Sequence, residues 1–479
     1  MKRLYRLFVL LALICLTAGA KAQNDGVTFT LLPQMPYSNF FNPGIRVPYK
    51  AIVGVGVSNI NLSVYSSSLK YGNIYGKNAA GEDVIDGVKL FNSLEEQDNF
   101  INFNMSFDVF NIGFRINKLF VNIDYRNKIN SEFQYSKDFV GFFVKGNGYY
   151  VGDNPCDFNI GVDGTIYSEL GVGLQYDVTE HFTIGVRPKL LVGIANVKVN
   201  NERTKIYTDA DDYSISADVN LNIRMANTFN ASMERMGDII KFVDIENMEL
   251  KDFFSIQKNF GMGVDFGLSY VFNKHFGLSA GAYDIGFIRW KNTKVKNVSK
   301  ENLEINKTLF NDISQITDMQ LDYESMLDNV VKQVWGNDSL VAGDDYTTYL
   351  KSKIMLQGYY ELHPTIRFTA VAQMYYVNGQ MRPAMTVAYS GAFLNFLNLS
   401  LSYTNSKYAG SSLGAGIGLH IGILNLYAVT DNISIASKMF SSTMEMMTSF
   451  DSANFRVGVV LTLGKYQSLK RLFSKSNAE

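Results

Sequence analysis

The sequence predicts an all-β protein: a transmembrane antiparallel β-barrel of about 14 strands (roughly 12 to 16) with helical extracellular loops. Three observations predict this fold: an export signal, long segments in which apolar and polar residues alternate, and no segment well suited to a membrane-spanning helix. The composition agrees, because the 479 residues include 34 Phe, 28 Tyr and 39 Gly but only 8 Pro. Such a balance favours strands and tight turns over disorder.

Residues 1–22 have the features of a cleaved signal peptide. A basic start, an apolar stretch over 7–16 and a small-x-small motif at 20–22 follow one another in the expected order. We expect the mature chain to begin at Gln23, outside the cytoplasm. Removal of Cys15 then leaves Cys156 as a lone cysteine, so an intrachain disulfide is excluded.

The segment 23–48 is punctuated by proline, which predicts a fixed irregular structure. Four of the eight prolines fall within sixteen residues, between Pro33 and Pro48, and such a segment cannot be a central strand. It is either a lead-in outside the barrel or a plug inside it. The residues that we single out as a candidate luminal hatch are Asn39, Phe40, Phe41, Asn42, Pro43 and Gly44.

The barrel itself is assigned to 49–464, on the evidence of strands with period two. In "INFNMSFDV" (101–109) apolar and polar residues alternate, and 111–126 repeats the pattern as a hairpin. The longest alternation, over 214–225, has the roughly 9 to 11 residues that a tilted strand needs to cross a bilayer. We therefore expect it to be a membrane strand.

The most apolar segment after the signal, "LGAGIGLHIGILNLYAV" (413–429), is the main rival to the barrel, as a membrane-spanning helix. Its glycines at 414, 416, 418 and 422 share one strand face, so period two is the better description. A last strand over 454–464 follows, and then a basic tail over 465–479.

The connections between strands are expected to differ at the two ends of the barrel. Tyrosine precedes a short polar turn in "YDVTEHFTIGV" (176–186), "YVFNKHFGLSA" (270–280) and "YELHPTIRFTA" (360–370). Longer insertions near 228–258 and 299–351 carry apolar residues at three- and four-residue spacing, which predicts amphipathic helices. Short turns at one end and long loops at the other are typical of outer-membrane barrels.

Signatures of enzymes, metal sites and nucleic-acid binding are weak or absent in the sequence. With 44 Lys and Arg against 45 Asp and Glu, nothing in the charge favours nucleic acid. The four histidines form no His-x-x-x-His pair, and "GSSLG" (410–414) precedes a strand rather than a helix. We expect no enzymatic activity, no metal and no cofactor.

Charged residues on the polar strand faces would lie in the lumen. Their mixed signs predict a salt-bridged, occluded interior rather than an open selective pore. A purely structural network is the alternative. The candidate lumen-facing residues are Arg115, Asp124, Arg126, Arg187, Lys189, Asp218, Arg224 and Arg367.

Two stretches carry a family resemblance: "LLPQMPYSNFFNPG" (31–44) with the strands from residue 51, and "VTDNI" (429–433) before the last strand. They resemble uncharacterised Bacteroidetes outer-membrane proteins of the DUF5723 type and, more distantly, FadL-like and PorV-like barrels. The FadL-like resemblance implies a luminal hatch at 23–48. The chain departs from the usual pattern at its end, where the basic tail follows the last strand, so the assembly machinery would need an internal signal.

Three functional hypotheses remain open from the sequence. The first is an outer-membrane barrel, plugged, that binds or passes small and in part hydrophobic molecules. The second is a non-transporting outer-membrane scaffold for a secretion or surface partner, as the PorV-like resemblance implies. The third is a secreted soluble β-protein. Expected partners are outer-membrane lipid, the barrel-assembly machinery, and either a small hydrophobic ligand or a surface or secretion partner.

Overall fold

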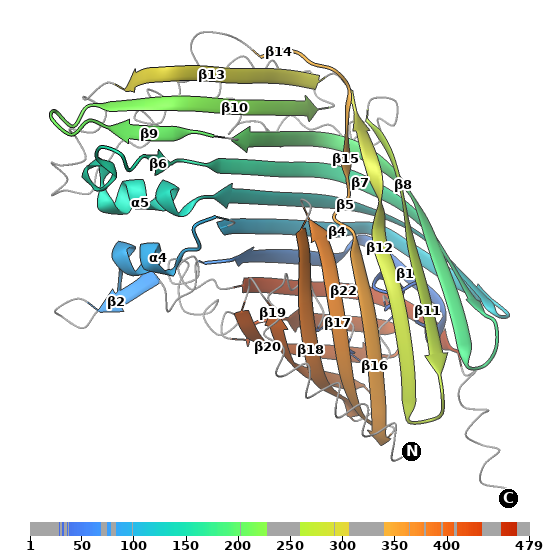
Figure 1. Cartoon of the computed structure of the whole chain (residues 1–479). Helices are drawn as coiled ribbons and strands as arrows, with labels where there is room; N and C mark the ends of the chain where they lie inside the picture. The colour runs from blue at the N-terminus through green and yellow to red at the C-terminus, as the bar shows by residue number, and fades with distance from the viewer. Residues whose placement is uncertain are drawn as a thin grey trace, which may run out of the picture.

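The computed structural model describes most of the chain and is dominated by strands (Figure 1). The described residues are Thr28, 31–32, Pro36, 38–68, 74–77, 83–97, 99–201, 203–227, 259–291, 293–305, 340–363, 365–377, 380–393, 396–406, 410–433 and 452–466. The signal peptide, the predicted helical insertion at 228–258 and the tail from 467 onward lie outside these residues.

Fourteen antiparallel strands form a closed barrel, as predicted. β1 pairs with β22 and thereby joins the two ends of the sheet, so the barrel has no free edge. The strands are β1 (Tyr49–Ser66), β4 (Asn99–Ile116), β5 (Leu119–Tyr135), β7 (Ile160–Asp177), β8 (Phe182–Asn201), β11 (Phe260–Val271), β12 (Phe276–Trp290), β16 (Lys353–His363), β17 (Ile366–Val377), β18 (Gln380–Phe393), β19 (Leu397–Ser406), β20 (Gly410–Ile421), β21 (Leu424–Thr430) and β22 (Ser452–Lys465).

The two ends of the barrel differ in the length of their connections. Short turns join β4 to β5, β7 to β8, β11 to β12 and β16 to β17, at the end where Tyr49 pairs with Lys465. The three predicted tyrosine-turn segments are hairpins at this end. The segment 413–429 is also a hairpin, β20 to β21, with Gly422 in its turn at a φ of +64°.

The polar strand faces are buried and the apolar faces are exposed, the reverse of a soluble sheet. In β4, Asn102 and Asp108 are fully buried, whereas Ile112 is 45% and Phe114 47% exposed. The same contrast recurs around the barrel, and "INFNMSFDV" therefore turns its apolar face outward. An apolar outer surface of this extent is stable in lipid and not in water. Within the described residues, no helix is long and apolar enough to cross a membrane.

Beyond the barrel, the sheet continues as an extension at the end with long connections (Figure 1). β8 pairs with β11 through its first half and with β10 through its second half. The added strands are β6 (Cys156–Asp157), β9 (Lys205–Thr208), β10 (Ile215–Asn227), β13 (Thr293–Ile305), β14 (Val341–Ala342) and β15 (Tyr346–Tyr349).

The expectation that 214–225 crosses the membrane is wrong. This segment is β10, which belongs to the extension, and Ile223 and Met225 are fully buried in a cluster with Phe142 and Tyr150. Alternation reports one apolar and one polar face, but it does not say whether lipid or protein covers the apolar face.

Short helices and a small hairpin lie in the connections of the described residues. They are η1 (Ser38–Phe40), α4 (Gly87–Ser93), α5 (Lys137–Lys145), η2 (Asn147–Tyr150) and the hairpin of β2 (Tyr75–Lys77) with β3 (Asp83–Ile85). The side chain of Ser136 caps α5 by accepting a hydrogen bond from Phe139 N. Cys156 is free and buried, and burial raises the pKa of its thiol.

The predicted helical insertion over 299–351 is wrong at both ends. Residues 299–305 belong to β13, and the stretch before 351 contains β14 and β15, because these residues pair with existing sheet edges. The part between 306 and 339 lies outside the described residues.

Candidate functional site

The N-terminal segment runs inside the barrel. We call residues 38–48 the luminal segment; its six candidate hatch residues, Asn39 to Gly44, are all buried. Asn42 Nδ2 donates a hydrogen bond to Ala280 O at 3.1 Å, and Gly44 N donates to Asn42 Oδ1 at 2.8 Å. Ser269 Oγ donates to Gly44 O at 2.6 Å. The segment is therefore bound to β11 and β12.

Glycines in the barrel wall allow this close approach. A Cβ atom built on Gly267 would lie 2.0 Å from Asn42 Oδ1, and one on Gly185 would lie 2.0 Å from Pro43 O. Only glycine leaves room for another backbone at such positions. β8 and β11 thus accommodate the luminal segment by the absence of side chains.

At the short-turn end, the segment is held by an ionic cluster that includes the predicted luminal residue Arg115. Arg46 Nε lies 2.9 Å from Asp177 Oδ1, and Arg115 Nη1 lies 3.0 Å from Asp177 Oδ2. Arg115 also donates to Val47 O at 3.1 Å, and its guanidinium carbon lies 3.9 Å from the ring centre of Tyr466. This cluster joins the start of β1 to the end of β22.

At its other end, the luminal segment presents two phenylalanines to basic side chains. The guanidinium carbon of Arg126 lies 3.9 Å from the ring centre of Phe40, and that of Arg187 lies 5.4 Å away. Arg456 lies 4.5 Å from the ring centre of Phe41. Cation–π contacts of this geometry are attractive, and more so where water is excluded.

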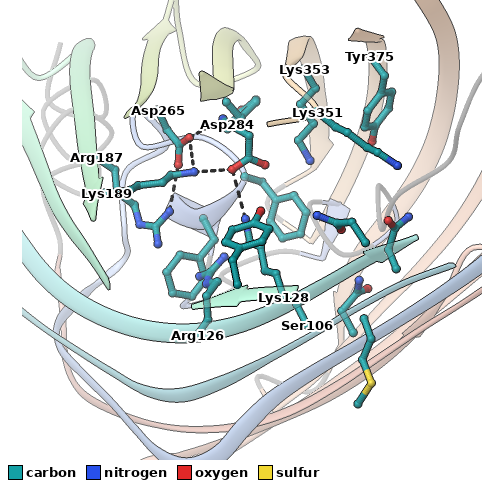
Figure 2. Close-up of a pocket in the computed structure, with 18 of the residues that line it drawn as sticks. Ser106, Arg126, Lys128, Arg187, Lys189, Asp265, Asp284, Lys351, Lys353 and Tyr375 are labelled. Atoms are coloured by element: carbon teal, nitrogen blue, oxygen red, sulfur yellow. Dashed lines mark hydrogen bonds and ion pairs between the residues drawn. The ribbon is translucent and has the colours of Figure 1, made fainter. Parts of the chain in front are cut away.

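Next to these phenylalanines is a cavity of about 120 Å³ inside the barrel (Figure 2). Its polar lining is mostly basic, and Figure 2 shows these side chains converging from several strands. The charged residues that line it are Arg126, Lys128, Arg187, Lys189, Lys351, Lys353, Arg456, Asp265 and Asp284.

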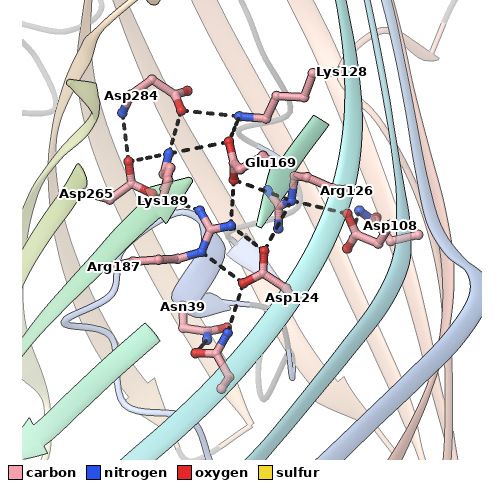
Figure 3. A network of polar contacts seen from close by, with 12 residues as sticks. Asn39, Asp108, Asp124, Arg126, Lys128, Glu169, Arg187, Lys189, Asp265 and Asp284 are labelled. Carbon is pink, nitrogen blue, oxygen red and sulfur yellow. Dashed lines mark hydrogen bonds and ion pairs between the residues drawn. The ribbon is translucent and has the colours of Figure 1, made fainter. Parts of the chain in front are cut away.

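One wall of the cavity is a buried ionic network centred on Arg187 (Figure 3). Arg187 contacts Asp124 through two nitrogens, one of them Nε at 3.0 Å, and Glu169 Oε1 at 2.5 Å. Its third carboxylate partner is Asp265, 3.0 Å from Nη1. Side-chain exposure is 2% or less in all four residues.

Two lysines and a second arginine extend this network. Lys189 Nζ lies 2.5 Å from Asp265 Oδ1 and 2.6 Å from Asp284 Oδ1. Lys128 Nζ lies 2.9 Å from Glu169 Oε2. Arg126 Nε lies 3.4 Å from Asp108 Oδ1. Four of the predicted luminal residues therefore lie together in this network: Asp124, Arg126, Arg187 and Lys189.

Sequence reasoning missed Lys128 and four acidic members of the network: Asp108, Glu169, Asp265 and Asp284. A signal existed for Asp265, which is a charged residue between the apolar Val264 and Phe266 in a strand. Asp284 also has apolar neighbours, but regular strand alternation assigns it to the outer face, because the register of β11 with β12 shifts between Val264 and Phe266. At this bulge Asp284 has a φ of +52°, and its N–H donates to Asp265 Oδ1 at 2.7 Å. Bulges commonly redirect side chains in this way.

The other three predicted luminal residues lie elsewhere. Asp218 and Arg224 belong to β10, outside the barrel, so placing them in the lumen was wrong. Asp218 accepts hydrogen bonds from Tyr207 Oη and Asn302 N, and Arg224 is exposed. Arg367 pairs with Glu361 near the short-turn end.

Comparison with known proteins identifies a family match. The model of DUF5723, a family of unknown function, matches residues 43–431. No curated protein matches the chain.

Solved structures that are similar to this chain include two proteins of Pseudomonas. The toluene transporter TodX of P. putida is 9% identical, with a TM-score of 0.40 over 94% of this chain and 97% of that chain. A FadL homologue of P. aeruginosa is 10% identical, with a TM-score of 0.43 over 93% and 98%.

Proposed function

Because the chain belongs to the DUF5723 family, whose function is unknown, we propose a function from its own geometry. It is an outer-membrane β-barrel, plugged by its N-terminal segment, that binds or passes small molecules, hydrophobic ones among them. The observation that carries this proposal is the position of the luminal segment, which lies inside a closed barrel beside a cavity of about 120 Å³.

The outer membrane is the location that fits the outer surface of the barrel. The exposed apolar faces suit lipid, and exposed aromatic residues such as Phe114, Tyr176 and Tyr270 lie near the short turns, where barrels carry an interfacial girdle. In this orientation the short turns face the periplasm and the extension faces outward. Export by a cleaved signal peptide and insertion by the barrel-assembly machinery are parts of the same proposal.

Passage requires the luminal segment to move. The closed sheet leaves the lumen as the route for a solute, and the segment crosses that route with hydrogen bonds to β7, β11 and β12. Individual hydrogen bonds contribute about 0.5–1.5 kcal/mol each, so a local rearrangement is feasible without unfolding of the barrel. Binding in the cavity needs no such movement.

The test is passage of solutes into liposomes that contain the full-length protein. We expect faster entry of small solutes than into protein-free liposomes, with a small apolar solute such as toluene and a polar one such as glycerol measured side by side. A rate equal to that of protein-free liposomes for both solutes would contradict a role in passage.

The scaffold hypothesis is the second candidate, and two observations favour it. The ionic network fills one side of the lumen, and the sheet of β10 and β13 extends beyond the barrel. A scaffold predicts unchanged liposome permeability together with a specific partner that is lost when the extension is altered. Cross-linking on intact cells, followed by mass spectrometry, separates this outcome from passage.

The soluble hypothesis makes a different prediction about fractionation. A secreted β-protein would be recovered without detergent, whereas the proposed barrel would pellet with outer membranes. It would also migrate differently on a gel before and after boiling, because a closed barrel resists unfolding in detergent. Recovery in the soluble fraction would contradict the membrane location and the proposed function with it.

A further inference from the structure

The cavity beside Phe40 and Phe41 carries an excess of positive charge. Seven basic residues line it against two aspartates. When the ion-pair partners behind the lining are included, the basic residues number eight and the acidic residues six within the part of the chain that the structure describes. The basic set is Arg126, Lys128, Arg187, Lys189, Lys351, Lys353, Arg382 and Arg456, and the acidic set is Asp108, Asp124, Glu132, Glu169, Asp265 and Asp284.

The acidic residues are concentrated on one side of the cavity. Asp265 and Asp284 lie next to Arg187 and Lys189, and Figure 2 shows Lys351 away from them, on the other side. Glu132 is the acidic residue nearest to this lysine, but Arg382 holds both of its oxygens, at 2.9 and 3.0 Å. Lys351 Nζ lies 3.8 Å from Glu132, too far for a hydrogen bond.

Several buried donors around the cavity have no hydrogen-bond partner among the described residues. They are Lys351 Nζ, Arg126 Nη2 and the hydroxyl of Tyr283. Tyr283 is only 2% exposed and lines the cavity. Buried polar groups nearly always have a partner, whether protein, water or ligand. All three groups can donate, so the missing partner is an acceptor.

We propose that this cavity binds an oxyanion: the phosphate or carboxylate group of a small solute. Water could accept the three hydrogen bonds, but it would not offset the excess positive charge. An oxyanion does both, because its oxygens accept several charge-assisted hydrogen bonds and bring negative charge. The inference rests on the proposed function in that it names the chemical class of the molecule that the barrel would take.

The cavity also limits what the anion can be attached to. Its volume of about 120 Å³ exceeds the space that a single water needs but holds only a small group. Phe40, Tyr167, Tyr283 and Tyr375 contribute apolar surface to the lining. The site therefore fits a free oxyanion or the charged end of a larger molecule.

The test is isothermal titration calorimetry on the full-length protein in an uncharged detergent. Inorganic phosphate is one probe and octanoate the other, which distinguishes a free oxyanion from the end group of an amphipathic molecule. We expect at least one probe to bind to the wild type, and Lys351→Gln to weaken that binding at least tenfold. Lys351→Arg keeps the charge and is expected to retain it.

Two further variants keep this test decisive. Arg289→Gln removes a basic residue from an exposed ion pair with Asp345, far from the network, and is expected to bind as the wild type does. Lys353→Gln removes a second lysine from the lining and is also expected to weaken binding. It takes the place of Lys351→Gln in the test if that variant fails to fold, which heat-dependent gel migration reveals.

Three outcomes bear on the inference. No binding of either probe, or binding that both lysine substitutions leave unchanged, overturns it. Lysine-dependent binding of octanoate alone supports it and identifies the anion as an end group. Binding without passage in the liposome measurement leaves the oxyanion site intact while refuting passage, so the two proposals fail independently.

Discussion

Arg187 is the residue through which most of the luminal network is connected. Its guanidinium contacts Asp124, Glu169 and Asp265, and all four side chains are almost completely buried. Moving charges out of water is costly, and the attraction between them compensates only while each charge keeps its partners. The network is therefore more sensitive to the loss of one member than a surface ion pair would be.

Replacement of Arg187 by alanine is expected to destabilise the barrel strongly. Three carboxylates would lose a partner at once, and breaking a buried pair in this way costs about 3–5 kcal/mol. The free energy of unfolding, from urea titration in detergent, measures the effect. The matched control is Arg289→Ala, which breaks an exposed pair whose side chains are 61% and 40% accessible and should cost no more than about 1 kcal/mol. Equal losses in the two variants would contradict the role assigned to Arg187.

Strand β11 is the element that most directly accommodates the luminal segment. Gly267 faces the segment at van der Waals contact, whereas Gly263, four residues earlier in the same strand, has its nearest neighbour 3.5 Å from a Cβ position. The two glycines therefore offer the same substitution in a crowded and in an ordinary environment.

Gly267→Ala is expected to displace the luminal segment, and Gly263→Ala is expected to leave it in place. The new methyl group would overlap Asn42 Oδ1 and the backbone of Gly44, so the segment must shift. We expect trypsin to cleave after Arg46 several-fold faster in Gly267→Ala than in wild type, measured by mass spectrometry. Faster entry of solutes into liposomes should accompany this change if the segment acts as a plug. Identical cleavage rates in the two variants would argue against the close fit.

Closure of the sheet between β1 and β22 is the property of the whole molecule on which the other proposals depend. The pairing covers both ends of the two strands, with Tyr49 opposite Lys465 and Tyr65 opposite Ser452. Ser63 and Asn454 are directly opposite each other in this register.

A cysteine pair at these positions should lock the barrel. In a Cys156→Ser background, Ser63→Cys with Asn454→Cys is expected to form a disulfide on oxidation, because opposite residues lie within the distance that a disulfide spans. The cross-linked barrel should then resist the change in gel migration on boiling until it is reduced. Ser63→Cys with Val460→Cys, six residues out of register and so roughly 20 Å away, should not cross-link. Efficient cross-linking of the second pair would contradict the register.

The sequence predicted the luminal residues only where a strand keeps a regular period. Arg187, Lys189, Asp124 and Arg126 were found by their parity, that is, by whether their position along the strand is odd or even. Parity assigns a side chain to one face of a sheet. The bulge between β11 and β12 changes the parity, and for that reason Asp284 was missed. Asp218 and Arg224 were misplaced for another reason, since parity does not tell a barrel strand from a strand of the extension.

Patterns within the sequence predicted long alternating strands, short turns at one end of the sheet and a proline-rich segment that could not be a strand. These are local properties, set by side-chain alternation and by the backbone limits of proline and glycine. The three-dimensional fold, in contrast, sets which apolar faces meet lipid and which meet protein. The fold also places the luminal segment inside the barrel and sets which charges meet around the cavity. Those outcomes depend on contacts between residues far apart in the chain, such as Arg187 with Asp124 or Gly267 with Asn42, and periodicity within a single strand carries no information about them.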